Sequence, residues 1–229
     1  MITSNNKPQV IWNEALCTQC DLCLIACPKQ STPKTQRYSV EQLLTIIRQQ
    51  LYFINGITIS GGEASLQLPF VIELFNAIKA DKELAHLTCM LDSNGSLSVS
   101  GWRQLLPVLD GAMVDLKSWQ QDTHRYITGR GNHRVISAIE LLASQGKLHE
   151  VRLLHIPGIS DFDSEVTAVA SHLKTLPKKV RIKLNAFQHH GVTGTALNWP
   201  NCSEAQIKQL VTDLTQHGVN NIVLPSSYL

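Results

Sequence analysis

From residue 39 onward, apolar residues follow two alternating patterns along the chain. Compact apolar runs of five to seven residues predict buried strands at 56–60, 87–91, 111–116, 150–156, 179–184 and 220–225. Between them, apolar residues recur every three or four positions, which predicts amphipathic helices at 39–53, 69–80, 98–109, 134–146, 163–176 and 203–218. Strands that alternate with helices in this way predict a parallel sheet with crossover helices.

Local signals mark the ends of several of these helices. Ser39 is placed to cap the first one, and Pro69 falls in the first turn of the second. Gly146 closes the predicted helix at 134–146. These residues support the boundaries that the periodicity suggests.

Polar and glycine residues follow five of the predicted strands. The segments are GGEAS (61–65), DSNGS (92–96), DLKSW (115–119), PGISD (157–161) and NAFQHHGV (185–192). One such segment would be an ordinary turn. In a parallel barrel, however, the carboxyl ends of the strands share one face, and active sites lie there. Five successive strand ends with polar, charged or glycine residues therefore predict a binding site on that face.

The residue types at these strand ends suit an amino-acid moiety. The glycines of the GGE segment at 61–63 allow the backbone to approach a ligand closely, and its glutamate can accept hydrogen bonds from an ammonium group. Lys117 and Arg152 can neutralise a carboxylate. The alternative is that these two cations form ion pairs inside the barrel mouth with Glu63, Asp92 or Asp115.

A run of four cysteines precedes this region. Cys17, Cys20, Cys23 and Cys27 have the spacing C-x2-C-x2-C-x3-C-P, which is typical of ligands for a 4Fe-4S cluster. In two-cluster ferredoxins the first three thiolates hold one cluster and the fourth, here expected on a short helix, serves the other. A structural zinc site and a chance cluster without metal are the alternatives, although zinc sites usually separate two cysteine pairs by a longer stretch. Cys89 lies in an apolar run and is expected to be buried.

Composition bounds the class of protein. With 229 residues and 43% hydrophobic content, the chain can form one core with a small appendage. We divide it into an iron-sulfur segment at 1–38 and a barrel at 39–229. The net charge of +2 gives no argument for nucleic acid or an anionic membrane. The absence of a secretory signal and of a long apolar run predicts a cytoplasmic protein, in which thiols stay reduced.

Five motifs together carry a resemblance to a known family. ITISGGEASLQ, LDSNG, MVDLK, VRLLHIPGISD and LNAFQHHG resemble motifs of radical S-adenosylmethionine enzymes. More narrowly, they resemble the glycyl radical enzyme activating enzymes, relatives of pyruvate formate-lyase activase, in the subgroup with a ferredoxin-like insert (YjjW-type). The resemblance implies an α/β fold with a partial (β/α)6 TIM-like barrel. It also implies S-adenosylmethionine and a 4Fe-4S cluster as cofactors, a glycyl radical enzyme as protein substrate, and a flavodoxin or ferredoxin as reductant.

The resemblance also assigns residues to the cofactor. Its motifs place Gly61, Gly62 and Glu63 at the amino group of the methionine moiety, and Asp92, Ser93, Met113 and Asp115 in a cation and cofactor-binding set. They place Lys117, Arg152 and Asn185 close to the cofactor. The family often has a histidine where this chain has Gln188, followed by His189 and His190. We take His190 as the candidate, with His189 or a plain exposed turn as alternatives.

One family feature is missing. A C-x3-C-x2-C loop binds the cluster that reduces S-adenosylmethionine in that family, and this motif does not occur in the chain. The resemblance therefore implies that the first barrel strand, this loop and half of the ferredoxin-like insert would lie upstream of Met1, because of a truncation or a misplaced start. The catalytic residues stay unassigned. The alternatives are a non-catalytic S-adenosylmethionine-binding or partner-binding remnant, or a small iron-sulfur electron-transfer protein.

Overall fold

The computed structural model describes residues 2–4, 7–28 and 31–225. The chain forms two compact units, Met1–Leu43 and Leu44–Leu229. The units divide inside helix α2 (Val40–Gln49), whereas the boundary expected from the sequence fell just ahead of this helix.

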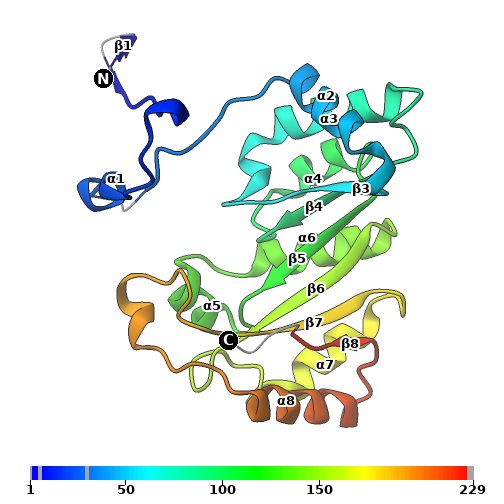
Figure 1. Ribbon diagram of the computed structural model, residues 1–229. Helices are drawn as coiled ribbons and strands as arrows, with labels where there is room; N and C mark the ends of the chain where they lie inside the picture. The colour runs from blue at the N-terminus through cyan, green and yellow to red at the C-terminus, as the bar shows by residue number, and fades with distance from the viewer. Residues whose placement is uncertain (1, 5–6, 29–30, 226–229) are drawn as a thin grey trace. The chain divides into compact units, whose positions relative to one another are not determined.

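The second unit is built on a parallel six-stranded sheet. Its strands are β3 (Gly56–Ile59), β4 (Thr88–Ser93), β5 (Gly111–Leu116), β6 (Leu148–His155), β7 (Arg181–Ala186) and β8 (Ile222–Val223). They pair in chain order, so β3 and β8 are the two edges and the sheet is open (Figure 1). The six predicted strands and the partial-barrel fold are therefore confirmed.

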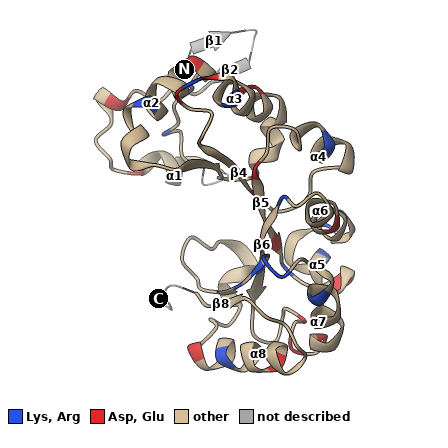
Figure 2. Cartoon of the chain, turned by 90° about the vertical axis from the view of Figure 1, so that its right-hand side faces the viewer, with Lys and Arg blue, Asp and Glu red and all other residues tan. Residues whose placement is uncertain are grey.

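Helices cover one side of this sheet (Figure 2). They are α3 (Leu68–Ala80), α4 (Val99–Leu105), α5 (Gln121–Thr128), α6 (His133–Ser144), α7 (Val166–Thr175) and α8 (Glu204–Gln216), with short 3₁₀ turns η2 (Leu51–Phe53), η3 (Ala64–Gln67) and η4 (Gly194–Asn198). Helix α5 was not predicted. Only His124 of its residues is buried, so it lacks the apolar periodicity that marks the other helices.

The two faces of the sheet differ in polarity. On β5, Val114 and Leu116 are buried under the helices, where fully buried Phe75 and Trp102 form part of the core. Alternate residues point to the other face, and there Asp115 is only half-buried. The open face therefore carries the polar side chains of the strand ends.

The predicted helix ends are confirmed at three places. The Ser39 hydroxyl accepts a hydrogen bond from Gln42 N at 3.3 Å, and Pro69 lies in the first turn of α3. Gly146 follows α6 with a φ of 66°, a left-handed conformation that favours glycine.

A capping box at the start of α8 gives a test of local stability. The Ser203 hydroxyl accepts a hydrogen bond from Gln206 N at 3.3 Å, and the Gln206 side chain accepts one from Ser203 N. We expect Ser203→Ala to lower the free energy of unfolding by about 1 kcal/mol, measured by urea denaturation. Ser171→Ala is the control, because the Ser171 hydroxyl only donates to a carbonyl inside α7 and its loss should cost less than about 0.5 kcal/mol. Equal losses would contradict the capping role.

The first unit is small. It contains the antiparallel strands β1 (Ile2–Ser4) and β2 (Lys7–Gln9), the turn η1 (Glu14–Leu16) and helix α1 (Leu22–Ala26). Cys23 lies in α1, but Cys27 lies one residue beyond its end, where its N–H donates to the Cys23 carbonyl at 3.1 Å. The expected place of Cys27 on the helix was therefore one residue off. No helix in the described ranges has the length and apolar character needed to cross a membrane.

Candidate functional site

The loop after β3 is tied to the end of β4 by one carboxylate. Glu63 Oε1 accepts hydrogen bonds from Ser93 Oγ at 2.8 Å and from Ser65 N at 3.2 Å, and its Oε2 accepts one from Asn94 N at 2.7 Å. A carboxylate has about four acceptor positions, so one position of Glu63 remains for a ligand. The two strand-end segments predicted to meet are thus brought together.

The glycines ahead of Glu63 leave open space. Gly61 has a φ of 99° and Gly62 a φ of 47°, both in the region that favours glycine. A Cβ placed on either glycine would meet no atom within 4 Å. This loop therefore has room for the close approach of a ligand, which fits the S-adenosylmethionine that the resemblance implies.

Arg152 on β6 is the centre of a polar network on the open face. Its guanidinium donates to Asp92 Oδ1 at 2.8 Å and to Glu150 Oε1 at 2.7 Å, and it contacts Met113 Sδ at 3.0 Å. Burial opposes the charge on Arg152, but the hydrogen bonds to Glu150 and Asp92 outweigh it and raise the pKa of the guanidinium. Ser60 Oγ donates to the second oxygen of Asp92 at 3.0 Å.

Lys117 forms a separate ion pair at the site. Its Nζ lies 2.8 Å from Asp115 Oδ2, and both side chains are partly exposed, at 28% and 22%. Asp115 stands directly beside Arg152 in the pairing of β5 with β6. The sequence left open whether Lys117 and Arg152 face a ligand carboxylate or form ion pairs inside the barrel mouth. In this structure both cations form such ion pairs.

The end of β7 contributes Asn185 and two histidines. Asn185 is half-buried on the open face. His189 Nε2 lies 2.6 Å from the Trp199 carbonyl oxygen and packs edge-on against Phe187, so its ring is fixed by the loop. His190 is exposed and has no hydrogen bond within the described residues. It is therefore the histidine of the two that is available to a ligand.

Two residues of this region, Glu150 and Asp161, were not predicted from the sequence. Glu150 is 3% exposed and bridges Arg152 to Arg181 Nε, which lies 3.3 Å from its second carboxylate oxygen. Its position two residues before Arg152 on one strand was a usable signal, because alternate residues share a face. Asp161 holds the loop after β5, and only tertiary structure reveals this contact.

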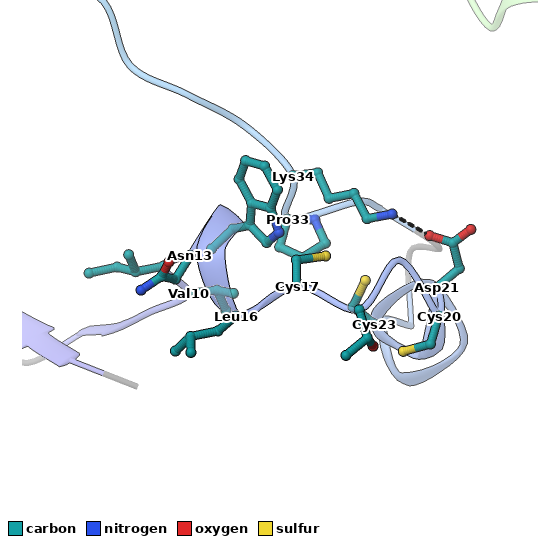
Figure 3. A pocket seen from close by; sticks show the side chains of 12 residues that line it. Val10, Asn13, Leu16, Cys17, Cys20, Asp21, Cys23, Pro33 and Lys34 are labelled. Atoms are coloured by element: carbon teal, nitrogen blue, oxygen red, sulfur yellow. Dashed lines mark hydrogen bonds and ion pairs between the residues drawn. The ribbon is translucent and has the colours of Figure 1, made fainter.

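Three of the four clustered cysteines line one cavity in the first unit. Cys17, Cys20 and Cys23 border a cavity of about 370 Å³, together with Trp12 and Lys34 among others (Figure 3). The Lys34 ammonium is held by Asp21 at 2.6 Å. The cavity therefore places thiols next to a cation and an indole.

The surroundings of Cys17 and Cys20 favour the ionised form of both thiols. The indole N–H of Trp12 is the main cause that lowers the pKa of Cys17. The hydroxyl of Thr18 is the main cause that lowers the pKa of Cys20. Metal ligation requires thiolates, so the donor chemistry fits an iron-sulfur cluster.

The geometry fits less well. Among the residues that the structure describes, no three His, Cys, Asp or Glu side chains are grouped closely enough to hold a metal ion. Coordination at Cys17–Cys27 thus requires the thiols to converge further. Cys89 and Cys202 are buried, and burial raises the pKa of each thiol to about 11. Cys89 is a small core residue, as expected.

The chain belongs to the radical SAM superfamily, which it matches over residues 16–170. Its relatives are glycyl radical enzyme activases. It is 33% identical over 159 residues to the pyruvate formate-lyase 1-activating enzyme of Escherichia coli (strain K12). The matched region covers 67% of this chain and 63% of that enzyme. It is 29% identical over 178 residues to the isethionate sulfite-lyase activating enzyme of Oleidesulfovibrio alaskensis, covering 74% of this chain and 56% of that enzyme.

A solved structure agrees on the fold. A domain of the pyruvate-formate lyase-activating enzyme from Bacteroides vulgatus superimposes with a TM-score of 0.60 at 20% identity, over 75% of this chain and 99% of that domain. At this identity the likeness concerns the fold alone. The chain spans between half and two thirds of the length of the two curated relatives above.

Proposed function

We propose that this chain is the S-adenosylmethionine-binding barrel of a glycyl radical enzyme activase. The observation that carries the proposal is the open Gly61–Gly62 loop, which Glu63 fixes at the face where the charged strand ends meet. Its relatives act as activases for pyruvate formate-lyase and isethionate sulfite-lyase.

The residues have distinct tasks in this proposal. Gly61 and Gly62 admit the methionine moiety, and the remaining acceptor position of Glu63 takes its ammonium group. Lys117 and Arg152 exchange part of their present ion pairing for the carboxylate of the cofactor. Further cofactor contacts are assigned to Asp92, Ser93, Met113, Asp115, Asn185 and His190. When bound and cleaved by one electron from a reduced cluster, S-adenosylmethionine would supply a 5′-deoxyadenosyl radical able to take a hydrogen atom from a backbone glycine of the partner enzyme.

The residues present do not fit the reducing cluster. The sequence contains no C-x3-C-x2-C, and the described side chains form no group able to hold a metal ion at the barrel mouth. The described residues of this chain therefore supply no ligand set for that cluster. Cys17, Cys20, Cys23 and Cys27 are proposed as ligands of a separate 4Fe-4S cluster.

The partners follow from the same proposal. The protein substrate is a glycyl radical enzyme, and the electron donor is a flavodoxin or ferredoxin. The cytoplasmic location expected from the sequence stays a prediction.

The test separates cofactor binding from cleavage. The chain is purified without oxygen, reconstituted with iron and sulfide, and reduced. Calorimetry with S-adenosylmethionine should show binding, while chromatography should show no 5′-deoxyadenosine above a control without iron, because the reducing cluster lacks its ligands. A chain extended by a C-x3-C-x2-C segment should then give product.

Two results would count against this account. Absence of binding to the 229-residue chain would remove the cofactor role of the barrel. Formation of 5′-deoxyadenosine by that chain would mean that the cysteines at 17–27 serve as the reducing cluster.

A further inference from the structure

Asp161 lies at the end of the PGISD segment after β6 and holds the segment after β5. Its carboxylate accepts three hydrogen bonds: from Ser118 Oγ at 2.8 Å, Trp119 N at 2.7 Å and Gln120 N at 2.7 Å. The residue is 9% exposed, so these bonds are shielded from water. Hydrogen bonds to an ionised group are roughly twice as strong as neutral ones.

The segment that Asp161 holds begins directly after Lys117. Ser118 is fully buried, and the Asn132 side-chain amide also donates to the carbonyls of Ser118 and Trp119. Consecutive Cα atoms are about 3.8 Å apart, so fixing the backbone at residue 118 also fixes the origin of the Lys117 side chain. Lys117 Nζ in turn lies 2.8 Å from Asp115 Oδ2.

Asp161 is itself held rigidly within its own loop. The Ile156 carbonyl accepts hydrogen bonds from Ile159 N at 3.0 Å and Ser160 N at 2.9 Å. The Ser160 hydroxyl accepts one from Ile156 N at 2.8 Å. A tight turn therefore fixes the Asp161 carboxylate, and its hydrogen bonds link the loop after β6 to the loop after β5.

We propose that Asp161 is a positioning residue for Lys117. It keeps the Lys117 ammonium at the barrel mouth, where the carboxylate of S-adenosylmethionine is placed by the proposed function on which this inference rests. The competing explanation is a purely structural one, in which Asp161 stabilises the start of helix α5, two residues after Trp119.

A double-mutant cycle distinguishes these explanations. S-adenosylmethionine affinity and the urea unfolding midpoint are measured for the reconstituted chain, Asp161→Asn, Lys117→Met and the double variant. Asp161→Asn presents an amide to three donors, so the segment loosens and affinity should fall about tenfold. In the Lys117→Met background the same change should alter affinity less than about twofold, because the group that Asp161 positions is already gone.

A readout without cofactor tests the same point. The Lys117 side chain is 28% exposed, and mass spectrometry can follow its reaction with an amine-directed reagent. Asp161→Asn should speed this reaction several-fold. Lys208, on α8 and 64% exposed, should react at an unchanged rate. This result decides the positioning role even if the chain binds no S-adenosylmethionine, an outcome that would remove only the proposed function.

The control variant is Asp122→Asn. Asp122 lies in the first turn of α5, is 93% exposed, and within the described residues its side chain forms an ion pair with Arg125. It should leave both affinity and labelling unchanged. The inference is overturned if Asp161→Asn lowers the unfolding midpoint but leaves Lys117 labelling and cofactor affinity unchanged, or if its effect on affinity is the same with and without Lys117.

Discussion

We expect Arg152→Met to lower the free energy of unfolding by about 3 kcal/mol, the loss typical of a buried charge that has lost its partner. Glu150 is 3% exposed and bonds Arg152 Nε at 2.7 Å. Without Arg152, its remaining ion pair among the described residues is with Arg181, which is 42% exposed and lies 3.3 Å away. Asp92 loses its ion pair as well. Urea denaturation followed by circular dichroism measures the change.

The control and the rescue make this expectation specific. Arg125→Met removes an exposed ion pair on α5, which contributes less than about 1 kcal/mol. Adding Glu150→Gln to Arg152→Met removes the orphaned negative charge and should restore part of the lost stability. A loss for Arg152→Met no larger than that for Arg125→Met would mean that Glu150 does not need its arginine.

The second large effect concerns the cofactor rather than stability. We expect Gly61→Ala to weaken S-adenosylmethionine binding about 100-fold, which corresponds to about 2.7 kcal/mol. The new Cβ enters the space that no protein atom fills, and the φ of 99° at this residue is unfavourable for alanine. Stability should fall by only about 1–2 kcal/mol, because the strain is local. Calorimetry and urea denaturation measure the two quantities separately.

A matched glycine separates ligand exclusion from backbone strain. Gly129 follows α5 with a φ of 77°, and a Cβ there also meets no atom within 4 Å. Gly129→Ala should therefore cost similar stability but leave cofactor affinity within about twofold of the parent chain. If both alanine variants lose affinity to the same degree, the loss comes from general destabilisation and not from the cofactor space at Gly61.

The fold was predictable where one side of an element is buried. The runs at 111–116 and 150–156 alternate or cluster apolar residues because one face of β5 and β6 lies under helices. Helix α5 was missed because its residues are mostly polar and its place depends on neighbouring loops. Cys27 was placed one residue off, since helix ends depend on local hydrogen bonds that spacing does not reveal.

The sequence indicated which residues follow the strands, but it left open how the charged ones pair. The sequence placed Lys117 and Arg152 at strand ends, yet their partners depend on strand register, and β5 and β6 are offset by an irregularity between Ala112 and Met113. That offset brings Asp115 beside Arg152. Asp161 acts across two loops, so no local pattern indicates its contact with the backbone at 118–120.

The order of the sheet also has a consequence for how the site is assembled during folding. Because β3 to β8 pair in chain order, each new strand pairs with the strand just before it in the chain. Only one crossover connection has to form at each step. During synthesis the Glu63 contact with Asn94 can form once β4 is in place, whereas Asp92 must wait for Arg152 on β6. Until β6 docks, the carboxylate of Asp92 lacks its ion pair with Arg152. A chain folded only as far as β5 therefore has the Gly61–Gly62 loop but not the positive charge of Arg152 at the site.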